Sequence, residues 1–224
     1  MPGYQTKFET IAIGDSNYCI RSLRDKQQYS DPLDTAADAG VSSASWPLFG
    51  QVWPAGIILA DLMDRHCVDG LRILEIGCGL ALASLVICRR GADITASDYH
   101  PLACEFLENN VAINGFPTIP FALGDWSNAD ATLGTFDLII GSDILYEPDH
   151  PMLLANFIQR HANADVEIII IDPDRGRHSK LSNAMGALGY RCTREKIQSQ
   201  LALELCFKGH RLTFARGLGS VRAD

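Results

Sequence analysis

The chain has 224 residues, of which 47% are hydrophobic and 21% are charged, and its formal net charge is -8 at pH 7. A chain of this length and composition can bury one large core, so a single globular domain is expected. The acidic balance argues against binding of a nucleic acid, because contacts with a phosphate backbone need a basic face. A neutral or basic partner is favoured.

The sequence shows neither a long apolar run nor a charged-then-apolar leader at Met1. We therefore expect no membrane span and a cytoplasmic location. The seven cysteines form no C-x-x-C pair and mostly fall in apolar segments. This pattern predicts reduced core thiols, with neither a disulfide framework nor a metal site.

At the N-terminus, residues 7–24 contain two β-like runs, FETIAI and NYCIRSL, separated by Gly14, Asp15 and Ser16. These runs predict a β-hairpin, which we place beside the main sheet. Residues 25–45 are polar and small without a sustained period. They predict an irregular arm that becomes ordered when substrate or cofactor binds. We divide the chain into this hairpin and arm, residues 1–45, packed on a single globular domain, residues 46–224.

The segment WPLFGQVWPAGIILADLM, at residues 46–63, predicts a helix whose first turn contains Pro54. Trp53 then lies directly before the helix. Two roles for this tryptophan are open from the residues alone. It can pack in the core, or it can line a ligand pocket with its indole N–H bonded to a partner.

Residues 72–98, RILEIGCGLALASLVICRRGADITASD, predict a buried strand, a glycine turn, an apolar helix and a second strand. The turn consists of Gly77, Cys78 and Gly79. A strand that leads through such a turn into a helix N-terminus brings bare backbone N–H groups to the carboxyl edge of a parallel sheet. The stretch therefore predicts a nucleotide-type cofactor site.

The residues around the turn favour S-adenosylmethionine (SAM) over a dinucleotide. A dinucleotide fingerprint ends in a third glycine, but Leu82 occupies that position. Glu75 and Asp98, which end the two strands, suit a ligand that carries an ammonium and two ribose hydroxyls. LEIGCGLA resembles the first motif of the class I, seven-strand SAM-dependent methyltransferases, with Ala81 where many members have a third glycine. For the stretch alone, plain strand and helix packing is the alternative.

Tyr99 follows Asp98 directly and belongs to the same predicted site, as does Cys78 in the turn. After a helix at residues 101–115, IPFALGDW predicts a third strand with Asp125 and Trp126 at its end. A carboxylate there can accept a hydrogen bond from the adenine amine, and an aromatic ring can stack on the base. A loop acid beside a partly exposed tryptophan is the alternative.

FDLIIGSDILYEPDHPMLL, at residues 136–154, predicts a fourth strand and a polar loop. We assign Ser142 to the cofactor site. Asp143 and Tyr146 are three residues apart and can project together into the cleft. A carboxylate or phenol near the methyl group can accept a proton from an amine or orient it, so these two are the predicted catalytic residues. The alternative is a helix-capping acid and a core-covering tyrosine.

The remaining segments predict a fifth strand ending in IDPDRGR, a helix near residues 180–188, a strand from Tyr190 and a last strand near residues 209–215. The predicted fold is α/β, a Rossmann-like three-layer sandwich around a seven-stranded, mostly parallel sheet. The resemblance implies that the last strand is antiparallel. Of the six histidines, only His100 falls near the predicted site.

FGQVWPAG and GSDILY resemble segments of the protein-lysine methyltransferase subgroup, methyltransferase family 16, and IDPDRGR resembles its bacterial nicotinamide N-methyltransferase-like members. In that subgroup the matching tryptophan lies against the cofactor, which favours the pocket role for Trp53. The resemblance covers residues 46–177 and makes residues 46–224 a methyltransferase domain.

The resemblance implies SAM as cofactor, S-adenosylhomocysteine as product, and transfer of a methyl group to a lysine side chain of a protein. Two other functions remain open from the residues. One is N-methylation of a small-molecule amine such as nicotinamide. The other is a SAM-binding partner protein without catalysis.

Overall fold

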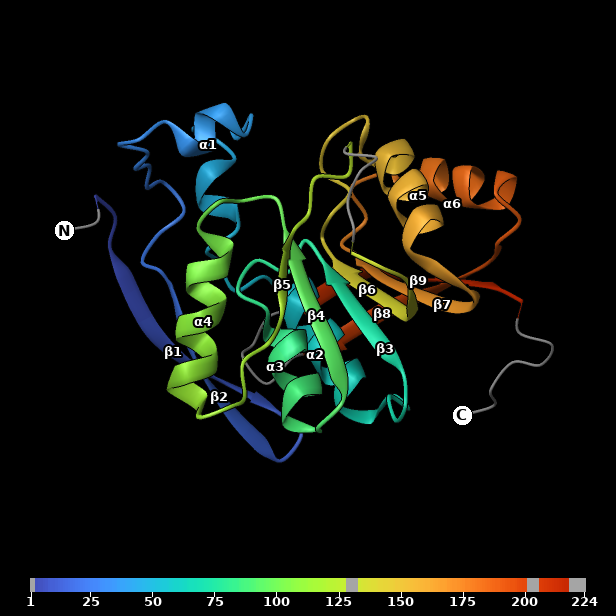
Figure 1. Ribbon diagram of the computed structural model, residues 1–224, viewed down its shortest axis with the longest axis horizontal. Helices are drawn as coiled ribbons and strands as arrows, with labels where there is room; N and C mark the ends of the chain where they lie inside the picture. The colour runs from blue at the N-terminus through green and yellow to red at the C-terminus, as the bar shows by residue number, and fades with distance from the viewer. Residues whose placement is uncertain (1–2, 128–132, 201–205, 218–224) are drawn as a thin grey trace.

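The computed structural model describes residues 3–127, 133–200 and 206–217 (Figure 1). Its strands are β1 (Thr6–Ile13), β2 (Ser16–Leu23), β3 (Arg72–Ile76), β4 (Asp93–Asp98), β5 (Phe121–Leu123), β6 (Phe136–Ser142), β7 (Ala162–Asp172), β8 (Arg191–Gln200) and β9 (Cys206–Arg216). Its helices are α1 (Thr35–Asp38), η1 (Trp46–Leu48), α2 (Pro54–Arg65), α3 (Leu82–Arg89), α4 (Ala103–Asn114), α5 (His150–His161) and α6 (His178–Ala187). Within these ranges, no helix combines the length and apolar character needed to cross a bilayer.

One mixed sheet has the strand order β5-β4-β3-β6-β7-β9-β8. The strands from β5 to β7 run parallel, and β9 is antiparallel to both β7 and β8. The order reverses between β3 and β6, where an open α/β sheet forms a crevice beyond its carboxyl edge. The predicted seven-stranded sheet with an antiparallel last strand is confirmed.

Alternate residues of the central strands face opposite sides of the sheet. On β3, Ile73 joins the hydrophobic cluster with α2, α3 and α4, whereas Leu74 joins the cluster with α5. Ile169 and Ile170 of β7 divide in the same way. Because helices cover both faces, both sets of side chains are buried and the strands read as continuous apolar runs. This confirms the three-layer sandwich.

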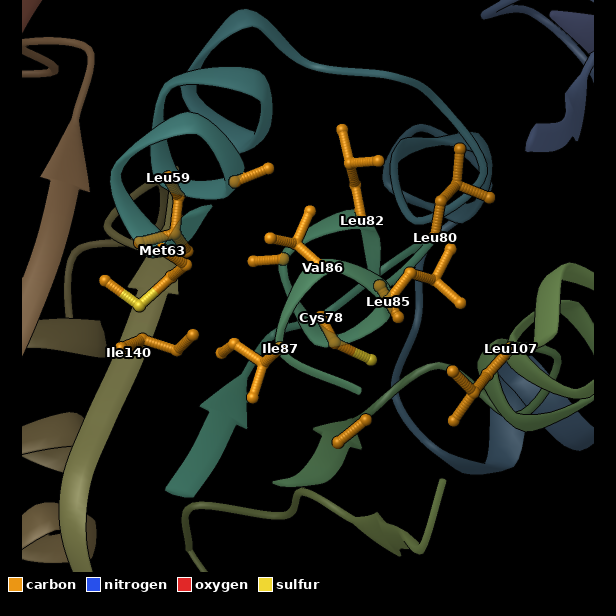
Figure 2. Packing of buried hydrophobic residues seen from close by; sticks show 14 of the residues in the cluster. Leu59, Met63, Cys78, Leu80, Leu82, Leu85, Val86, Ile87, Leu107 and Ile140 are labelled. Atoms are coloured by element: carbon orange, nitrogen blue, oxygen red, sulfur yellow. The ribbon is translucent and has the colours of Figure 1, made fainter. Parts of the chain in front are cut away.

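Helix α3, which follows the glycine turn, packs beside α2, and both helices contact the sheet. Figure 2 shows Leu59 and Met63 of α2 beside Val86 and Ile87 of α3, with Ile140 of β6 nearby. All five side chains are buried. Full burial of one such side chain contributes about 1.5–3 kcal/mol, so this contact holds α3 in place beside α2 and the sheet.

The N-terminal hairpin, β1 and β2, is confirmed, but it forms a sheet of its own and reaches the domain through α4 (Figure 1). Two asparagines of α4 bind the backbone of β2. The Oδ1 atom of Asn110 accepts the Arg21 N–H at 2.8 Å, and the Oδ1 atom of Asn114 accepts the Cys19 N–H at 2.9 Å. The helix thus satisfies backbone donors of an edge strand.

The arm at residues 25–45 contains the short helix α1, where the sequence suggested irregular structure. The Asp31 carboxylate accepts the Ala37 N–H at 2.8 Å, and the Gln51 side chain donates to the Asp25 carbonyl at 3.0 Å. The first bond closes a turn within the arm, and the second joins the arm to the domain. The division of the chain after residue 45 stays a prediction.

The cysteines differ from expectation. Six of them have described side chains; these are free thiols, and of the six only Cys78 is buried. The prediction that most cysteines lie in the core is wrong, because apolar neighbours in sequence do not decide which face of an element a side chain occupies.

Candidate functional site

A cavity of about 700 Å³ lies at the carboxyl edge of β3, β4, β5 and β6. Its volume falls in the range of small-molecule sites, roughly 300–1,000 Å³. All residues predicted for the cofactor and for catalysis line it, namely Trp53, Glu75, Gly77, Cys78, Gly79, Asp98, Tyr99, Asp125, Trp126, Ser142, Asp143 and Tyr146. The fold thus brings the sequence-predicted residues together in one place.

The glycine turn between β3 and α3 needs the conformations that glycine allows. The φ angles are 61° at Gly77 and 52° at Gly79, in the left-handed region. A Cβ on Gly79 would lie 2.8 Å from the carbonyl oxygen of Phe49. Ala81 also has a positive φ, 60°, although it carries a Cβ. The turn therefore runs close to Phe49 and leaves its backbone open to the cavity.

Asp98, at the end of β4, is held by two backbone N–H groups. Its Oδ2 atom accepts from Gly79 at 2.7 Å, and its Oδ1 atom accepts from His100 at 2.8 Å. Burial raises the pKa of this carboxyl, although these hydrogen bonds oppose the shift. Each carboxylate oxygen can accept a second hydrogen bond, so Asp98 is oriented with acceptor capacity left for a ligand.

Glu75, at the end of β3, is 4% exposed and bonds to the first residues of α3. Its Oε2 atom accepts hydrogen bonds from the backbone N–H of Ser84 at 2.8 Å and from the Ser84 hydroxyl. Burial raises the pKa of Glu75 to about 7. The Glu75 carboxyl therefore links β3 to α3, and it also borders the cavity.

Trp53 precedes α2, as predicted, and its indole N–H donates to the Leu48 carbonyl at 2.8 Å. The Lys26 ammonium lies 4.6 Å from the centre of one of its rings. The hydrogen-bonding edge of the indole is thus used within the protein. What Trp53 offers to the cavity is its apolar ring surface.

Beyond β5, the Oδ1 atom of Asp125 accepts hydrogen bonds from the N–H and the hydroxyl of Ser127, at 2.8 and 2.6 Å. These bonds form a local turn that holds the carboxylate. The Trp126 ring meets the His150 ring edge-on, with centroids 5.2 Å apart. His150 also lines the cavity, so the expectation that His100 alone among the histidines lies near the site is wrong.

Asp143 follows β6 with a φ of 54°, and its carboxylate binds the guanidinium of Arg175. The Nε atom donates to Oδ1 at 2.5 Å, and Nη2 donates to Oδ2 at 2.7 Å. Tyr146 lies on the same loop with its ring 4.6 Å from that of His150. Burial, with carboxylates nearby, raises the pKa of Tyr146 to about 12, which keeps the phenol neutral at pH 7.

The sequence did not indicate several residues that line the cavity. Arg175 is one, because nothing in IDPDRGR points to Asp143, 32 positions earlier. Phe49 is another; its ring stacks on that of His100 at 3.8 Å. Burial lowers the pKa of His100 to about 4, so this ring is neutral at pH 7. Residues of the arm, including Gly40 and Ser45, complete the wall.

Comparison with known proteins connects this site to a family. The sequence profile described as lysine methyltransferase matches residues 31–185. The mouse (Mus musculus) EEF1A lysine methyltransferase 3 is 33% identical over 143 residues, which are 61% of this chain and 56% of that protein. The histone-arginine methyltransferase METTL23 of Rattus norvegicus is 30% identical over 105 residues, 44% of this chain and 47% of that protein. The chain thus spans about half the length of these curated relatives.

Among solved structures, the 16S rRNA methyltransferase RsmC of T. thermophilus, in complex with AdoMet and guanosine, superposes with a TM-score of 0.63. The two are 14% identical, and the similarity covers 94% of this chain and 50% of that one. At this identity the likeness shows a shared fold. Since the family profile covers more than half of the sequence and includes all residues predicted for the cofactor and for catalysis, the chain belongs to the lysine methyltransferase family.

Proposed function

We propose that the chain is a SAM-dependent methyltransferase that transfers a methyl group to the side chain of a lysine in a protein. One observation carries this proposal: a single cavity joins the glycine turn and the strand-end acids with Asp143 and Tyr146. The family to which the chain belongs is described by this activity. The relatives named for lysine methylation support the choice of acceptor.

The residues of the cavity fit SAM. A side chain at Gly77 or Gly79 would collide with Ile144 or Phe49, so the turn needs glycine, and its backbone borders the cavity where a ligand can approach it. Asp98 is positioned to accept hydrogen bonds from the ribose hydroxyls. When bound, SAM supplies an electrophilic methyl group on its sulfonium.

Other residues hold the rest of this ligand. Glu75 presents a carboxyl group to its ammonium, and Cys78 and Tyr99 border it. Asp125 accepts from the adenine amine, and Trp126 covers the base. Trp53 and Ser142 close the cavity near the end of β6. Carboxylates and aromatic faces at successive strand ends suit a cationic ligand with a flat base.

The acceptor amine is oriented by Asp143 and Tyr146. Methyl transfer needs a neutral amine about 3 Å from the methyl carbon and in line with the bond that breaks. Asp143 attracts the incoming ammonium and points it into the cavity, and the neutral Tyr146 phenol accepts or donates one hydrogen bond. Because both oxygens of Asp143 already accept from Arg175, the ammonium releases its proton to water, and the carboxylate then holds the neutral amine in place.

The acceptor is carried by a protein with a basic segment. The net charge of -8 favours a cationic partner over a nucleic acid. We propose that the enzyme acts in the cytoplasm and is not bound to a membrane. One relative is named as a histone-arginine methyltransferase. The test must therefore also identify the amino acid that receives the methyl group.

A second candidate rests on the arm. Gly40, Val41, Ser42 and Ser45 line the cavity and could enclose a small-molecule amine such as nicotinamide. A pyridine nitrogen is neutral at pH 7, so it presents no ammonium for Asp143 to attract. The two acceptors therefore place different demands on Asp143.

The experiment is methyl transfer from labelled SAM to a lysate separated into protein and small-molecule fractions, with wild type and Asp143→Asn. The proposal expects label in protein, recovered as methyllysine after hydrolysis, and a loss of rate of about tenfold to a hundredfold in the variant, because the amine is no longer held in place. Label recovered as methylarginine, or only in the small-molecule fraction, contradicts the lysine assignment. SAM binding without transfer to either fraction assigns the chain to non-catalytic SAM-binding proteins.

A further inference from the structure

A second polar cluster lies outside the cavity, where β7, β9 and α6 meet (Figure 1). It consists of Asp172, Asp174, His178 and His210, and one ligand-type atom from each lies within 4.8 Å of the others. Asp172 ends β7 and is paired directly with His210 across the antiparallel strands. His178 begins α6. The fold therefore gathers these side chains from three separate elements.

The backbone is shaped for this approach. A Cβ on Gly209 would lie 2.3 Å from the carbonyl oxygen of Asp172, so only glycine permits the close packing of β9 beside that residue. Asp174 has a φ of 64°, in the left-handed region that a non-glycine residue seldom adopts. This strained conformation brings the Asp174 carboxylate back toward His178 and His210.

The polar atoms at the centre of the cluster lack hydrogen bonds. Asp172 is 1% exposed, and neither of its carboxylate oxygens has a hydrogen-bond partner among the described residues. The Nδ1 atoms of His178 and His210 are buried and also lack a hydrogen bond, although a carboxylate oxygen lies within 4 Å of each. A buried carboxylate without partners is costly, and native proteins rarely leave several such atoms side by side.

The distances between these atoms suit a metal ion. Nδ1 of His178 lies 3.6 Å from Oδ2 of Asp172 and 3.4 Å from Oδ1 of Asp174, and Nδ1 of His210 lies 3.8 Å from the same Asp174 oxygen. Ligand atoms around a tetrahedral zinc ion, each about 2.0–2.1 Å from it, lie about 3.4 Å from one another. We propose that these four side chains form a binding site for one divalent transition-metal ion.

The donor set indicates the class of ion. Two imidazole nitrogens and two carboxylate oxygens suit zinc or a similar first-row divalent ion better than magnesium or calcium, which prefer oxygen ligands alone. The two carboxylates also neutralise a doubly charged cation. Asp174 is the most open member, with 54% of its side chain exposed, and so gives the ion a path from solvent.

Arg194 contacts the other nitrogen of the His178 ring. Its Nη1 atom lies 2.8 Å from Nε2 of His178. A guanidinium can only donate, so this Nε2 accepts and the ring proton lies on Nδ1. A metal on Nδ1 moves the proton to Nε2, where it faces the guanidinium. Metal binding therefore displaces the Arg194 side chain, which is exposed and can move into solvent. Because this hydrogen bond must be broken first, Arg194 lowers the affinity of the site for the metal.

The ion has a structural consequence for the cavity. Asp174 immediately precedes Arg175, which binds Asp143. Ligation of Asp172, Asp174 and His178 ties down the segment between β7 and α6 on both sides of Arg175. The site is thus a structural anchor for the loop, and its existence does not depend on the reaction that the cavity performs.

The test is zinc binding by the intact, chelator-treated protein, measured by competition with a chromophoric chelator. Wild type is expected to bind one equivalent. His178→Gln, His210→Gln and Asp172→Asn should each weaken binding by at least about tenfold to a hundredfold, as loss of even an outer partner does. His66→Gln, which removes a histidine outside the cluster, should bind like wild type. Unchanged affinity in the cluster variants, or absence of binding in wild type, overturns the proposal.

Two further measurements identify the ligands. Arg194→Gln should bind zinc several-fold more tightly than wild type, whereas Lys180→Gln, which removes a nearby charge from α6, should not. Cobalt bound to the site should give the absorption of nitrogen and oxygen ligands. An intense thiolate charge-transfer band would instead mean that exposed cysteines hold the metal, and the proposal fails.

Discussion

The guanidinium of Arg175 binds both carboxylate oxygens of Asp143 in a bidentate pair. Only 11% of the Asp143 side chain is exposed, whereas 41% of Arg175 is. A carboxylate in such a pair is held in one orientation, because the two parallel hydrogen bonds fix its plane. Because both oxygens already accept from Arg175, the pair favours an orienting role for Asp143 in the proposed reaction over that of a proton acceptor.

Replacing Arg175 by Lys should reduce turnover while leaving cofactor affinity nearly unchanged. Lysine keeps the charge but loses the planar fork, so Asp143 is free to rotate. We expect kcat for the acceptor to fall by about tenfold to a hundredfold, the usual consequence of a small misplacement. The Kd of SAM should stay within about twofold of that of wild type.

Arg177→Lys is the matched control, since Arg177 precedes α6 and does not line the cavity. It should retain the wild-type kcat. If Arg175→Lys loses SAM affinity in proportion to its rate, Arg175 acts on the cofactor and the orienting role of the pair is wrong.

Glu75 should make stability depend on pH. Its pKa is about 7 in the folded protein, above the ordinary value of 4.5. Folding therefore favours the protonated carboxyl, and the stability that it contributes is full below about pH 4.5 and is lost as the pH rises through 7. From pH 6 to 8, wild type should lose about 1.4 kcal/mol of unfolding free energy relative to Glu75→Gln.

Urea unfolding of both proteins at the two pH values measures this difference. Glutamine keeps an oxygen that can accept from Ser84 but does not titrate. Parallel pH dependence of wild type and variant would mean that Glu75 is not protonated on folding.

The stability effect of substitutions at Ala81 should follow from its left-handed backbone conformation. It is fully buried and has a φ of 60°. Ala81→Gly relieves left-handed strain of about 1–2 kcal/mol but adds chain entropy of about 0.5–1 kcal/mol in the unfolded state, so its stability should equal or slightly exceed that of wild type. Ala81→Val combines a branched side chain with overpacking and should cost about 1–3 kcal/mol or more.

Denaturant unfolding of the two variants gives the comparison. The order Gly, Ala, Val in decreasing stability is expected. If glycine destabilises by more than about 1 kcal/mol, the strain at this position is relieved elsewhere in the turn.

The parts of the fold that depend on local pattern could be predicted from the sequence. Pro54 marked the start of α2, and Asn114 followed by Gly115 marked the end of α4, where Gly115 has a φ of 68°. Both signals act within a few residues, through the fixed φ of proline and the left-handed freedom of glycine. The strands of the sheet were visible for the same reason, as short apolar runs.

The parts that depend on distant pairing could not be predicted. Asn110 and Asn114 looked like ordinary helix residues, yet they bind the backbone of β2, and no local signal reports a partner some ninety positions away. Asp172 and His210 meet because β9 lies beside β7, a strand order that the sequence alone leaves open. Side-chain pairings of this kind follow only from the complete topology.

The candidate site could be predicted only in part. The strand ends could be read from the sequence, and the topology of a parallel sheet brings such ends to one edge. What each carboxylate binds within the protein could not be read. Asp143 was predicted as a proton acceptor or an orienting group, and its contact with Arg175, which favours the second role, could not be foreseen from the sequence.

The most direct test of the central claim is calorimetric binding of SAM to wild type and to Asp98→Ala. Wild type should bind SAM and S-adenosylhomocysteine with low micromolar affinity or better and should not bind NAD. Asp98→Ala removes the acceptor for two ribose hydroxyls, each bond being worth about 1.5–3 kcal/mol, so SAM affinity should fall at least tenfold. Asp93→Ala, at the opposite end of β4, should bind SAM like wild type. Binding of NAD without SAM, or equal SAM affinity in wild type and Asp98→Ala, would contradict the account.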